Sequence, residues 1–373
     1  MDHRVSKNFP VILCVMGATL LTGFGLVCLY SALRGSFEIP VNLFRKQAIL
    51  LALASVAGLV IACASERWIR RMAYAGLAGS ALLLVIVLLP GVGVRVNGAQ
   101  RWLDFGFVRL QVSEIVKVGF VIGMAHYMNR SQRDRQRFWK GMVIPIGITG
   151  LFSALVILEP DYGTAVLYGG VGVTMIFMWG GRLRYLLPMV SVGVLVVGAL
   201  IHQDPVRWKR ITSFLDTEAN RADGAYQLWQ GLHAFGAGGV TGVGIGNGRQ
   251  QLAYLPEAHT DFIFSVLGEE LGMVATLSIV VLFVVLFSGI VTIAARCFDS
   301  FWFLVTVGCG SFLTLQALFN MGVVTGCLPT KGISLPFISY GGSNLVGAFM
   351  MMGAVVCAWR HSNRSLIIHP REL

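Results

Sequence analysis

Apolar residues in this chain gather in ten long stretches. Each has about 20 mostly apolar residues, the length that an α-helix needs to cross a bilayer. The stretches are 9–32, 47–64, 72–89, 110–128, 141–158, 164–180, 185–202, 266–295, 301–326 and 341–360. The pattern predicts an all-α, polytopic membrane protein with about ten transmembrane helices.

The distribution of Lys and Arg predicts which side of the membrane each loop faces. An even number of spans puts both termini on one side, and cytoplasmic loops carry the excess of positive charge. With the N-terminus inside, cytoplasmic segments hold 16 Lys and Arg against 12 outside, of which five lie in one long loop where the rule weakens. We therefore expect both termini, including a short tail at 361–373, to be cytoplasmic.

Composition supports the membrane assignment and excludes several function classes. Hydrophobic residues make up 55% of the chain and charged residues 13%, about half of the usual share in a soluble domain. The net charge of +11 fits cytoplasmic loops better than nucleic-acid binding. The seven cysteines form no CxxC pair, so neither a zinc site nor a disulfide framework is expected. Nucleotide-binding motifs such as GxxxxGKS are also missing.

We treat residues 1–373 as a single membrane domain with one large extracytoplasmic loop, 203–265, between spans seven and eight. Structureless loops longer than about 15 residues are usually functional or disordered. The glycine-rich part of this loop, 236–248, suits close packing against helices or a tight re-entrant turn. Twelve of the 18 carboxylates lie outside or at the outer membrane edge. Acid–base chemistry is therefore expected on the outer face.

An acidic segment at the outer mouth of the eighth span is the strongest candidate for catalysis. Asp261 precedes Phe-Ile-Phe, and partial desolvation by these neighbours would raise its pKa and make it a better base. His259 and Thr260 stand directly before it. Glu269 and Glu270 lie farther along, and we expect them only to decorate the helix N-terminus, where negative charge is favoured.

The fourth span carries ionisable residues at its outer end. Glu114 and Lys117 are three positions apart, so they share one helical face and can pair. Ionisable groups at membrane depth are costly and indicate function by default. A structural ion pair between spans is an equal and compatible explanation. Arg109 begins this segment.

Three other outer loops offer polar groups. Arg101 lies beside Trp102; arginine suits phosphate, and the two residues equally suit an interface anchor. The segment 328–343, with two prolines and a Gly pair, predicts a re-entrant loop in which Lys331 faces a site, although a shaped connector fits as well. The turn 159–164 is expected to be structural. Together these loops suit an amphiphile with its tail in the bundle and its diphosphate at the basic residues.

Several of these segments resemble the SEDS family, the shape, elongation, division and sporulation proteins. The matching motifs follow in order over nearly the whole membrane region. They are Gly98-Ala-Gln-Arg-Trp-Leu-Asp104, Gln111-Val-Ser-Glu-Ile-Val-Lys117, Pro160-Asp-Tyr-Gly-Thr164, Leu255-Pro-Glu-Ala-His-Thr-Asp-Phe-Ile-Phe264, Gly268-Glu-Glu-Leu-Gly272 and Pro336-Phe-Ile-Ser-Tyr-Gly-Gly-Ser343. Leu328-Pro-Thr-Lys-Gly332 resembles the division branch, FtsW, more than the elongation branch, RodA. Glu159 stands where glutamine is common in the family.

The resemblance implies a peptidoglycan glycosyltransferase of the bacterial cytoplasmic membrane. It implies polymerisation of lipid II, an undecaprenyl-diphosphate-linked disaccharide peptide, on the extracytoplasmic face during septal wall synthesis in cell division. Asp261 matches the family's essential aspartate and is the expected catalytic base. The expected substrate-binding residues are Arg101, Arg109, Glu114, Lys117, His259, Thr260 and Lys331. The implied partners are a class B penicillin-binding protein, other division or elongation proteins and membrane lipid, with no nucleic acid.

A mechanism follows as a hypothesis. The 4-hydroxyl of a sugar on one lipid II attacks the anomeric carbon of the growing chain, inverts that centre and displaces the lipid diphosphate. Asp261 deprotonates the attacking hydroxyl. Basic residues, with a divalent cation such as Mg²⁺ or Mn²⁺, stabilise the departing diphosphate. The metal ligands are unknown from the sequence, and no nucleotide is expected.

Three other functions remain open on the sequence alone. The chain could flip lipid II across the membrane, polymerise it in the elongation pathway, or bind a synthase without catalysis. Acids gathered on one face favour an enzyme, because a carrier needs access to both sides. We also expect a partner's single helix to pack on spans eight and nine. Small and polar residues of span nine permit close approach there, namely Gly308, Gly310, Ser311 and Thr314.

Overall fold

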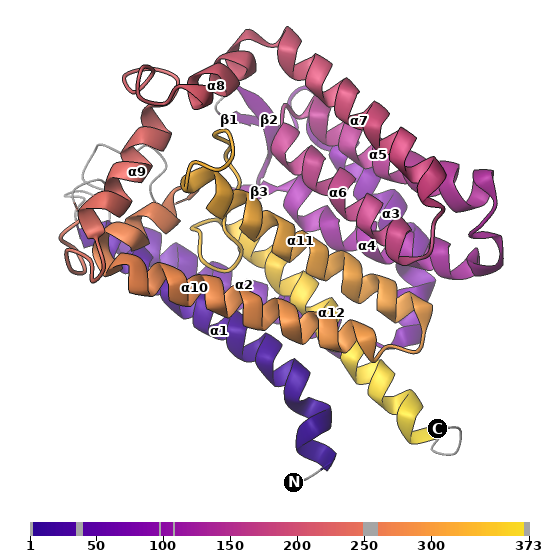
Figure 1. The fold of residues 1–373 in the computed structure, drawn as a ribbon. Helices are drawn as coiled ribbons and strands as arrows, with labels where there is room; N and C mark the ends of the chain where they lie inside the picture. The colour runs from indigo at the N-terminus through magenta and orange to yellow at the C-terminus, as the bar shows by residue number, and fades with distance from the viewer. Residues whose placement is uncertain (1–2, 35–39, 97, 107–108, 249–259, 369–373) are drawn as a thin grey trace.

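The computed structural model is a bundle of long helices with a small sheet and two short helices at one end (Figure 1). It describes residues 3–34, 40–96, 98–106, 109–248 and 260–368. The long helices are α1 (His3–Arg34), α2 (Pro40–Cys63), α3 (Glu66–Leu88), α4 (Val112–Arg130), α5 (Ile144–Leu158), α6 (Tyr162–Met178), α7 (Leu183–Gln203), α10 (Ile263–Ala295), α11 (Ser300–Val324) and α12 (Gly342–Ile368). A π-helical segment, Phe138–Val143, leads into α5, and a short 3₁₀ turn, Gln132–Asp134, follows α4.

These ten helices coincide with the ten apolar stretches of the sequence, which confirms the helical membrane fold. Eight helices in the described ranges are long and apolar enough to cross a membrane by length and composition. The other two are α4 and α6. The N-terminal end of α4 carries a charged pair, and α6 is a 17-residue helix. Both pack against α11, so their polar groups are covered by protein.

Several helices begin where a polar side chain caps the first turn. Ser65 caps α3, Asp161 caps α6, Asp204 caps α8 (Pro205–Leu215) and Asp299 caps α11, each by accepting a hydrogen bond from a first-turn backbone N–H. Pro205 at the first position of α8 loses nothing, since that N–H has no intrahelical partner. Local sequence therefore sets these starts, and packing decides which face each helix buries.

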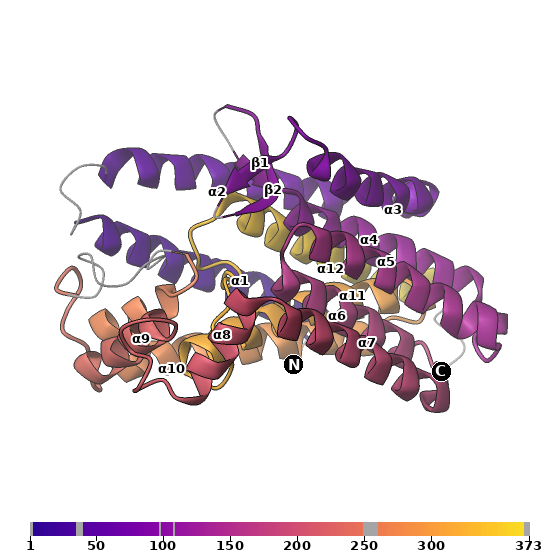
Figure 2. The ribbon, with the colours of Figure 1, turned by 90° about the horizontal axis from the view of Figure 1, so that it is seen from above.

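Two helices form the centre of the bundle. Helix α11 packs against α4, α6, α10 and α12, while α2 lies along α12 and α1 lies along α10. Seen from above, α12 lies between α2 on one side and α10 on the other (Figure 2). Helix α7 is the most exposed, with Leu186 as its one buried residue. The core is therefore built on α11 and α12, the helices that flank the predicted re-entrant loop.

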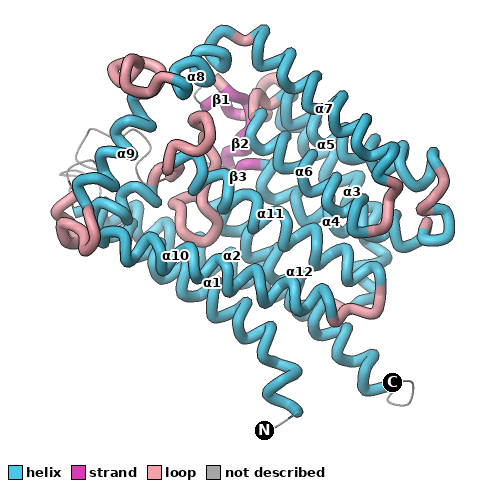
Figure 3. The backbone as a smooth tube through the Cα atoms, in the orientation of Figure 1, coloured by secondary structure: helices cyan, strands magenta, loops and turns pink. Residues whose placement is uncertain are grey.

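The start of α1 and the end of α12 lie at the same end of the bundle (Figure 1). This agrees with an even number of crossings, and the assignment of that end to the cytoplasm stays a prediction. The loops with the predicted site residues lie at the opposite end (Figure 3). Helix α12 continues to Ile368, so the tail predicted at 361–373 begins inside a helix.

A three-stranded antiparallel sheet, which the sequence analysis did not predict, precedes α4. Its strands β1 (Val94–Val96), β2 (Ala99–Asp104) and β3 (Arg109–Gln111) pair in the order β1-β2-β3. Two of the strands have only three residues, too few for an alternating pattern to be recognised. The sheet places Arg101 and Gln111 near the N-terminal end of α4.

The large loop at 203–265 is partly helical, with α8 and α9 (Tyr226–Gly238) inside it. Two of its glycines lie directly against α10: a Cβ on Gly238 would clash with the carbonyl of Gly268, and one on Gly242 with that of Glu270. Helix α10 is kinked at Gly272, where φ is 74°. Close packing of the glycine-rich segment is thereby confirmed.

Two expectations about the helices after this loop are wrong. Glu269 and Glu270 do not decorate the helix start, because they lie two turns into α10 and are only 2% and 1% exposed. Glu270 accepts hydrogen bonds from the Ser31 hydroxyl at 2.8 Å and from the Gly246 N–H at 3.0 Å. It therefore links α10 to α1 and to the glycine-rich segment.

Two glycines of α11 also differ from expectation. A Cβ on Gly308 would contact Val121 and Met175, and one on Gly310 would contact Ile290. These glycines allow α11 to approach α4, α6 and α10 within the bundle. Gly308 is therefore not part of a surface for a partner helix.

Candidate active site

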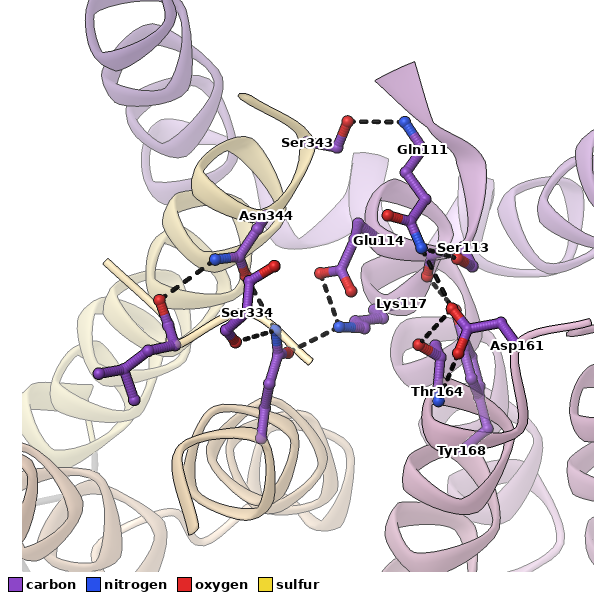
Figure 4. A network of polar contacts seen from close by, with 12 residues as sticks. Gln111, Ser113, Glu114, Lys117, Asp161, Thr164, Tyr168, Ser334, Ser343 and Asn344 are labelled. Carbon is purple, nitrogen blue, oxygen red and sulfur yellow. Dashed lines mark hydrogen bonds and ion pairs between the residues drawn. The ribbon is translucent and has the colours of Figure 1, made fainter. Parts of the chain in front are cut away.

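The predicted pair in α4 is confirmed and belongs to a buried network (Figure 4). Lys117 is fully buried, and its Nζ donates to Glu114 Oε2 and to Gln316 Oε1, each at 2.7 Å. Gln316 of α11 donates in turn to the carbonyl of Ser334 at 3.0 Å and to Oδ1 of Asn344 at 2.9 Å. We call these five residues the buried network; it links α4, α11 and α12 to the loop between α11 and α12.

That loop, 325–341, folds back into the bundle as the sequence predicted. It has no helix, and Leu335, Phe337 and Ile338 are buried. Its backbone polar groups are satisfied by helix side chains, since Asn344 donates to the Leu335 carbonyl at 3.3 Å and Asn320 to the Ile333 carbonyl at 2.6 Å. Irregular backbone in a membrane bundle requires such partners.

Asp261 lies just before α10, next to this loop. The side chain of Asn320 donates to its backbone carbonyl at 2.8 Å. A Cβ on Gly332 would lie 2.6 Å from Asp261 Oδ2, so the carboxylate contacts the glycine that follows Lys331. The structure therefore places Asp261 against the loop that carries Lys331, although the two segments are 70 positions apart in the chain.

The residue before Asp261, Thr260, is held by a hydrogen bond from the re-entrant loop. The Ser339 hydroxyl donates to the Thr260 carbonyl at 2.6 Å. This bond fixes the backbone of Thr260 against the re-entrant loop. His259, the third predicted residue of this segment, lies outside the described residues.

Asp161 organises the turn between α5 and α6. It is 6% exposed and caps α6 by accepting from the Thr164 N–H at 3.1 Å and the Thr164 hydroxyl at 2.9 Å (Figure 4). It also pairs with Arg101 at 3.3 Å and accepts from Gln111 Nε2 at 3.2 Å. The turn thereby holds the predicted Arg101 in place.

Glu159 lies two residues before Asp161 and is completely buried. Neither of its carboxylate oxygens has a hydrogen-bond partner in the described part of the chain. Burial raises the pKa of Glu159 to about 8; the negative charge of Asp161 raises it further, and Arg101 opposes the shift. At neutral pH this carboxyl is therefore mostly protonated.

Lys331 and Arg207 lie over the same aromatic ring. Lys331 Nζ is 5.3 Å from the centroid of the Tyr162 ring, and the Arg207 guanidinium carbon is 3.7 Å from it. Both contacts have the geometry of cation–π interactions. Helix α8 supplies Arg207 and, one turn later, Arg210. We call Arg101, Arg207, Arg210 and Lys331 the cation cluster.

The electrostatics of Lys331 reflect these neighbours. Burial is the main cause that lowers its pKa to about 8, while Asp161 raises it. Arg207, Arg210 and Arg101 lower it further by repulsion. The ammonium group therefore lies in a largely buried place near three arginines and one carboxylate, Asp161.

Arg109 lies apart from the buried network. It is on β3 and exposed, and its Nε pairs with Asp104 of β2 at 2.9 Å. The charged set expected around α4 is thus divided between the buried pair and an exposed ion pair on the sheet.

Sequence reasoning missed several polar groups of this end of the bundle. Gln316 and Asn320 are four positions apart in an apolar span, a spacing that puts both on one helical face. That signal could have found them. Arg207 and Arg210 gave no such signal, because only the docking of α8 brings them to Lys331.

A multi-pass helical bundle with carboxylates and cations gathered at one end defines an integral membrane protein with a polar site at a membrane face. The chain belongs to the FtsW/RodA/SpoVE family of cell cycle proteins, which it matches over residues 12–364. The resemblance found in the sequence motifs is thereby confirmed.

Individual relatives match over most of the chain. A protein of Coxiella burnetii named probable peptidoglycan glycosyltransferase FtsW is 39% identical over 361 residues, 93% of this chain and 94% of the relative. The protein of the same name from Saccharophagus degradans is 40% identical over 318 residues, 83% of this chain and 81% of its own.

Solved structures share the fold. One is a chain of a peptidoglycan synthase complex that coordinates polymerization and crosslinking, with a TM-score of 0.79, 26% identity, and coverage of 94% of this chain and 97% of that one. Another is the rod shape determining protein RodA of Thermus thermophilus, with a TM-score of 0.70, 26% identity, and coverage of 93% and 95%.

Proposed function

We propose that this chain is a peptidoglycan glycosyltransferase of the division branch, which polymerises lipid II on the outer face of the bacterial cytoplasmic membrane at the septum. The observation that carries the proposal is the contact of Asp261 with the loop of Lys331, beside the cation cluster. A general base and a set of cations for a diphosphate are the two groups that this transfer needs. Relatives 36–40% identical and named FtsW support the division branch.

Asp261 acts as the general base of the transfer. It takes the proton of the sugar 4-hydroxyl while the oxygen forms a bond to the anomeric carbon of the growing strand. The bond from that carbon to the diphosphate oxygen breaks, and the lipid diphosphate leaves with the bonding electron pair. Attack from the face opposite the leaving group inverts the anomeric centre.

The buried network acts as a positioning device for this step. Lys117 donates to both Glu114 and Gln316, and Gln316 in turn donates to the Ser334 carbonyl in the loop that contains Lys331 and Gly332. A buried ion pair persists where its remaining donors are also hydrogen-bonded. Its proposed role is to fix the loop beside Asp261 rather than to touch the reacting atoms.

A divalent cation, Mg²⁺ or Mn²⁺, fits this end of the bundle when one carboxylate and the substrate phosphates bind it together. The described residues contain no group of three His, Cys, Asp or Glu side chains that could hold a metal ion. Magnesium is commonly held by one or two carboxylates together with substrate phosphates. Asp261 is the carboxylate placed to contribute, and a cation bound there would offset charge on the diphosphate.

A class B penicillin-binding protein is the proposed partner, with other division or elongation proteins around the complex. The fold shared with a peptidoglycan synthase complex of coordinated polymerization and crosslinking supports this proposal. Gly308 and Gly310 of α11 are not part of the docking surface, because both pack within the bundle.

The test separates polymerisation from transport and from a purely scaffolding role. The purified full-length chain, alone and with its transpeptidase, is given lipid II in detergent micelles, where flipping is impossible. We expect glycan polymer on a gel. Absence of polymer in both samples, with lipid II transport in reconstituted vesicles, would instead establish a flippase; absence of both activities would leave a scaffold.

A further inference from the structure

The cation cluster contains more positive charge than its ion pairs neutralise. Arg101 pairs with Asp161 at 3.3 Å, and Arg207 pairs with Asp204 at 2.7 Å. Within the described ranges Lys331 and Arg210 form no ion pair. Cations gathered in this way repel one another unless an anion joins them.

A buried donor in the same cluster also has no acceptor. The Nε–H of Arg101 is buried and has no hydrogen-bond partner among the residues that the structure describes. A buried donor without an acceptor is unfavourable, so such groups are normally satisfied. Phosphate oxygens are strong acceptors with a geometry that suits arginine.

The ring of Tyr162 explains how the cations stay close together without an anion. Lys331 and Arg207 both rest on its negative face, at 5.3 Å and 3.7 Å from the centroid. Tyr162 directly follows Asp161, the partner of Arg101. The three cations therefore surround one short segment, from β2, α8 and the re-entrant loop.

We infer that Arg101, Arg207 and Lys331 bind the diphosphate that leaves the donor strand, and that the diphosphate of the attacking lipid II lies elsewhere. This inference rests on the proposed function and assigns α8, which the sequence analysis had left without a role, to the active site. Arg210 contributes longer-range positive charge to the same group.

The choice between the two diphosphates follows from the chemistry of the transfer. The donor diphosphate is bonded directly to the anomeric carbon under attack, so it lies beside the catalytic base. The diphosphate of the attacking lipid is separated from the reacting hydroxyl by its disaccharide. Because Asp261 contacts Gly332, the neighbour of Lys331, the cations belong with the diphosphate nearer the base.

The cluster then acts on the bond that breaks. Negative charge grows on the diphosphate oxygen as its bond to the anomeric carbon lengthens. Fixed cations stabilise this charge more in the transition state than in the ground state, which raises kcat rather than lowering KM. Loss of Arg207 should therefore reduce kcat more than it changes KM.

The first test measures binding without turnover. The full-length Asp261→Asn chain in detergent is titrated with undecaprenyl diphosphate, undecaprenyl phosphate, inorganic pyrophosphate and phosphatidylglycerol. We expect undecaprenyl diphosphate to bind most tightly, with inorganic pyrophosphate as a competitor. Arg207→Gln and Lys331→Met should each weaken undecaprenyl diphosphate at least tenfold. Lys209→Gln, a matched change on α8 at a residue paired with Asp223, should leave it unchanged.

The second test uses the protonation of Lys331. The ammonium group of Lys331 is influenced by Asp161 and Tyr162 at the α5–α6 turn, by Arg101 on β2, and by Arg207 and Arg210 on α8. Affinity for undecaprenyl diphosphate should fall as the pH rises above about 8, where Lys331 loses its charge in the empty site. Lys331→Arg should fold like the unsubstituted chain and keep its affinity at pH 9.

The outcomes separate this inference from the proposed function. Equal affinity of the Arg207→Gln, Lys209→Gln and unsubstituted chains, in a protein that polymerises lipid II, would overturn the inference alone. Phosphatidylglycerol binding as tightly as undecaprenyl diphosphate would also overturn it, by showing a general lipid-headgroup site. A chain that binds the diphosphate but forms no polymer would refute the proposed function and leave the anion site standing.

Discussion

The buried network and the cation cluster contain similar side chains, but they differ in whether the positive charge of the lysine is neutralised by a partner within the protein. In the buried network, Lys117 is fully enclosed and both its carboxylate and its amide partner lie at 2.7 Å. In the cation cluster, Lys331 lies on an aromatic ring among arginines, and burial and these neighbours lower its pKa to about 8. The first arrangement is complete within the protein, whereas the second is completed by an anion.

The comparison separates structural from ligand-binding roles for charged residues at a membrane face. Complete networks are expected to contribute stability, because removing one member leaves a buried charge alone. Incomplete ones are expected to cost stability and to contribute binding. Substitutions in the two regions should therefore have opposite signs.

The largest effect on stability is expected at the buried pair. Lys117→Met leaves the Glu114 carboxylate buried without its cation, which costs about 3–5 kcal/mol. The Lys117→Met and Glu114→Gln double variant should lose less than the sum of the single variants. Thermal unfolding in detergent measures the cycle, and additive losses would refute direct coupling.

The next largest effect on stability is expected at Glu159, which ends α5 and has no hydrogen-bond partner in the described chain. Its folded pKa of about 8 exceeds the model-compound value of 4.5, so the folded chain keeps a proton that the unfolded chain releases. Stability should fall as the pH rises from about 4.5 to about 8, by at most about 1.4 kcal/mol per pH unit, and then level off. Glu159→Gln should remove this slope in unfolding measured across pH.

A smaller effect on stability, opposite in sign to that of Lys117→Met, is expected at Lys331. The folded state disfavours its charge, so Lys331→Met should leave stability unchanged or raise it by about 1 kcal/mol at pH 7. The same unfolding assay provides the measurement. A loss as large as that of Lys117→Met would show that the two lysines have the same structural role.

The smallest effect is expected at the exposed pair on the sheet. The Arg109 side chain is 61% exposed, and surface ion pairs contribute about 0–1 kcal/mol. Arg109→Gln should therefore unfold within about 1 kcal/mol of the unsubstituted chain. Any loss of polymerisation by this variant then reports on substrate contact, and a large loss of stability would contradict the exposed geometry.

The sequence predicted those features that depend on local spacing. Apolar runs of span length gave all ten long helices, and the three-residue spacing of Glu114 and Lys117 predicted their ion pair. The prolines and the Gly pair near Lys331 predicted the re-entrant loop. In each case, residues close in the chain decide the outcome.

Features that depend on docking between distant segments were not predictable in this way. Arg207 and Arg210 join the site only because α8 folds onto the α5–α6 turn. Glu270 was placed wrongly because its partners, Ser31 and Gly246, come from α1 and the glycine-rich segment. A motif shows that a residue is acidic, but its burial depends on what packs around it.

Asp261 is proposed as the general base of a polymerase that has a preformed site for the diphosphate. The direct test compares purified unsubstituted and Asp261→Asn chains, each with its transpeptidase, for the rate of lipid II polymerisation in detergent. We predict a loss of roughly 10²–10⁴ in rate for Asp261→Asn, with unchanged thermal unfolding and unchanged co-purification of the partner. Polymer formed at a near-normal rate by the Asp261→Asn chain would contradict the account.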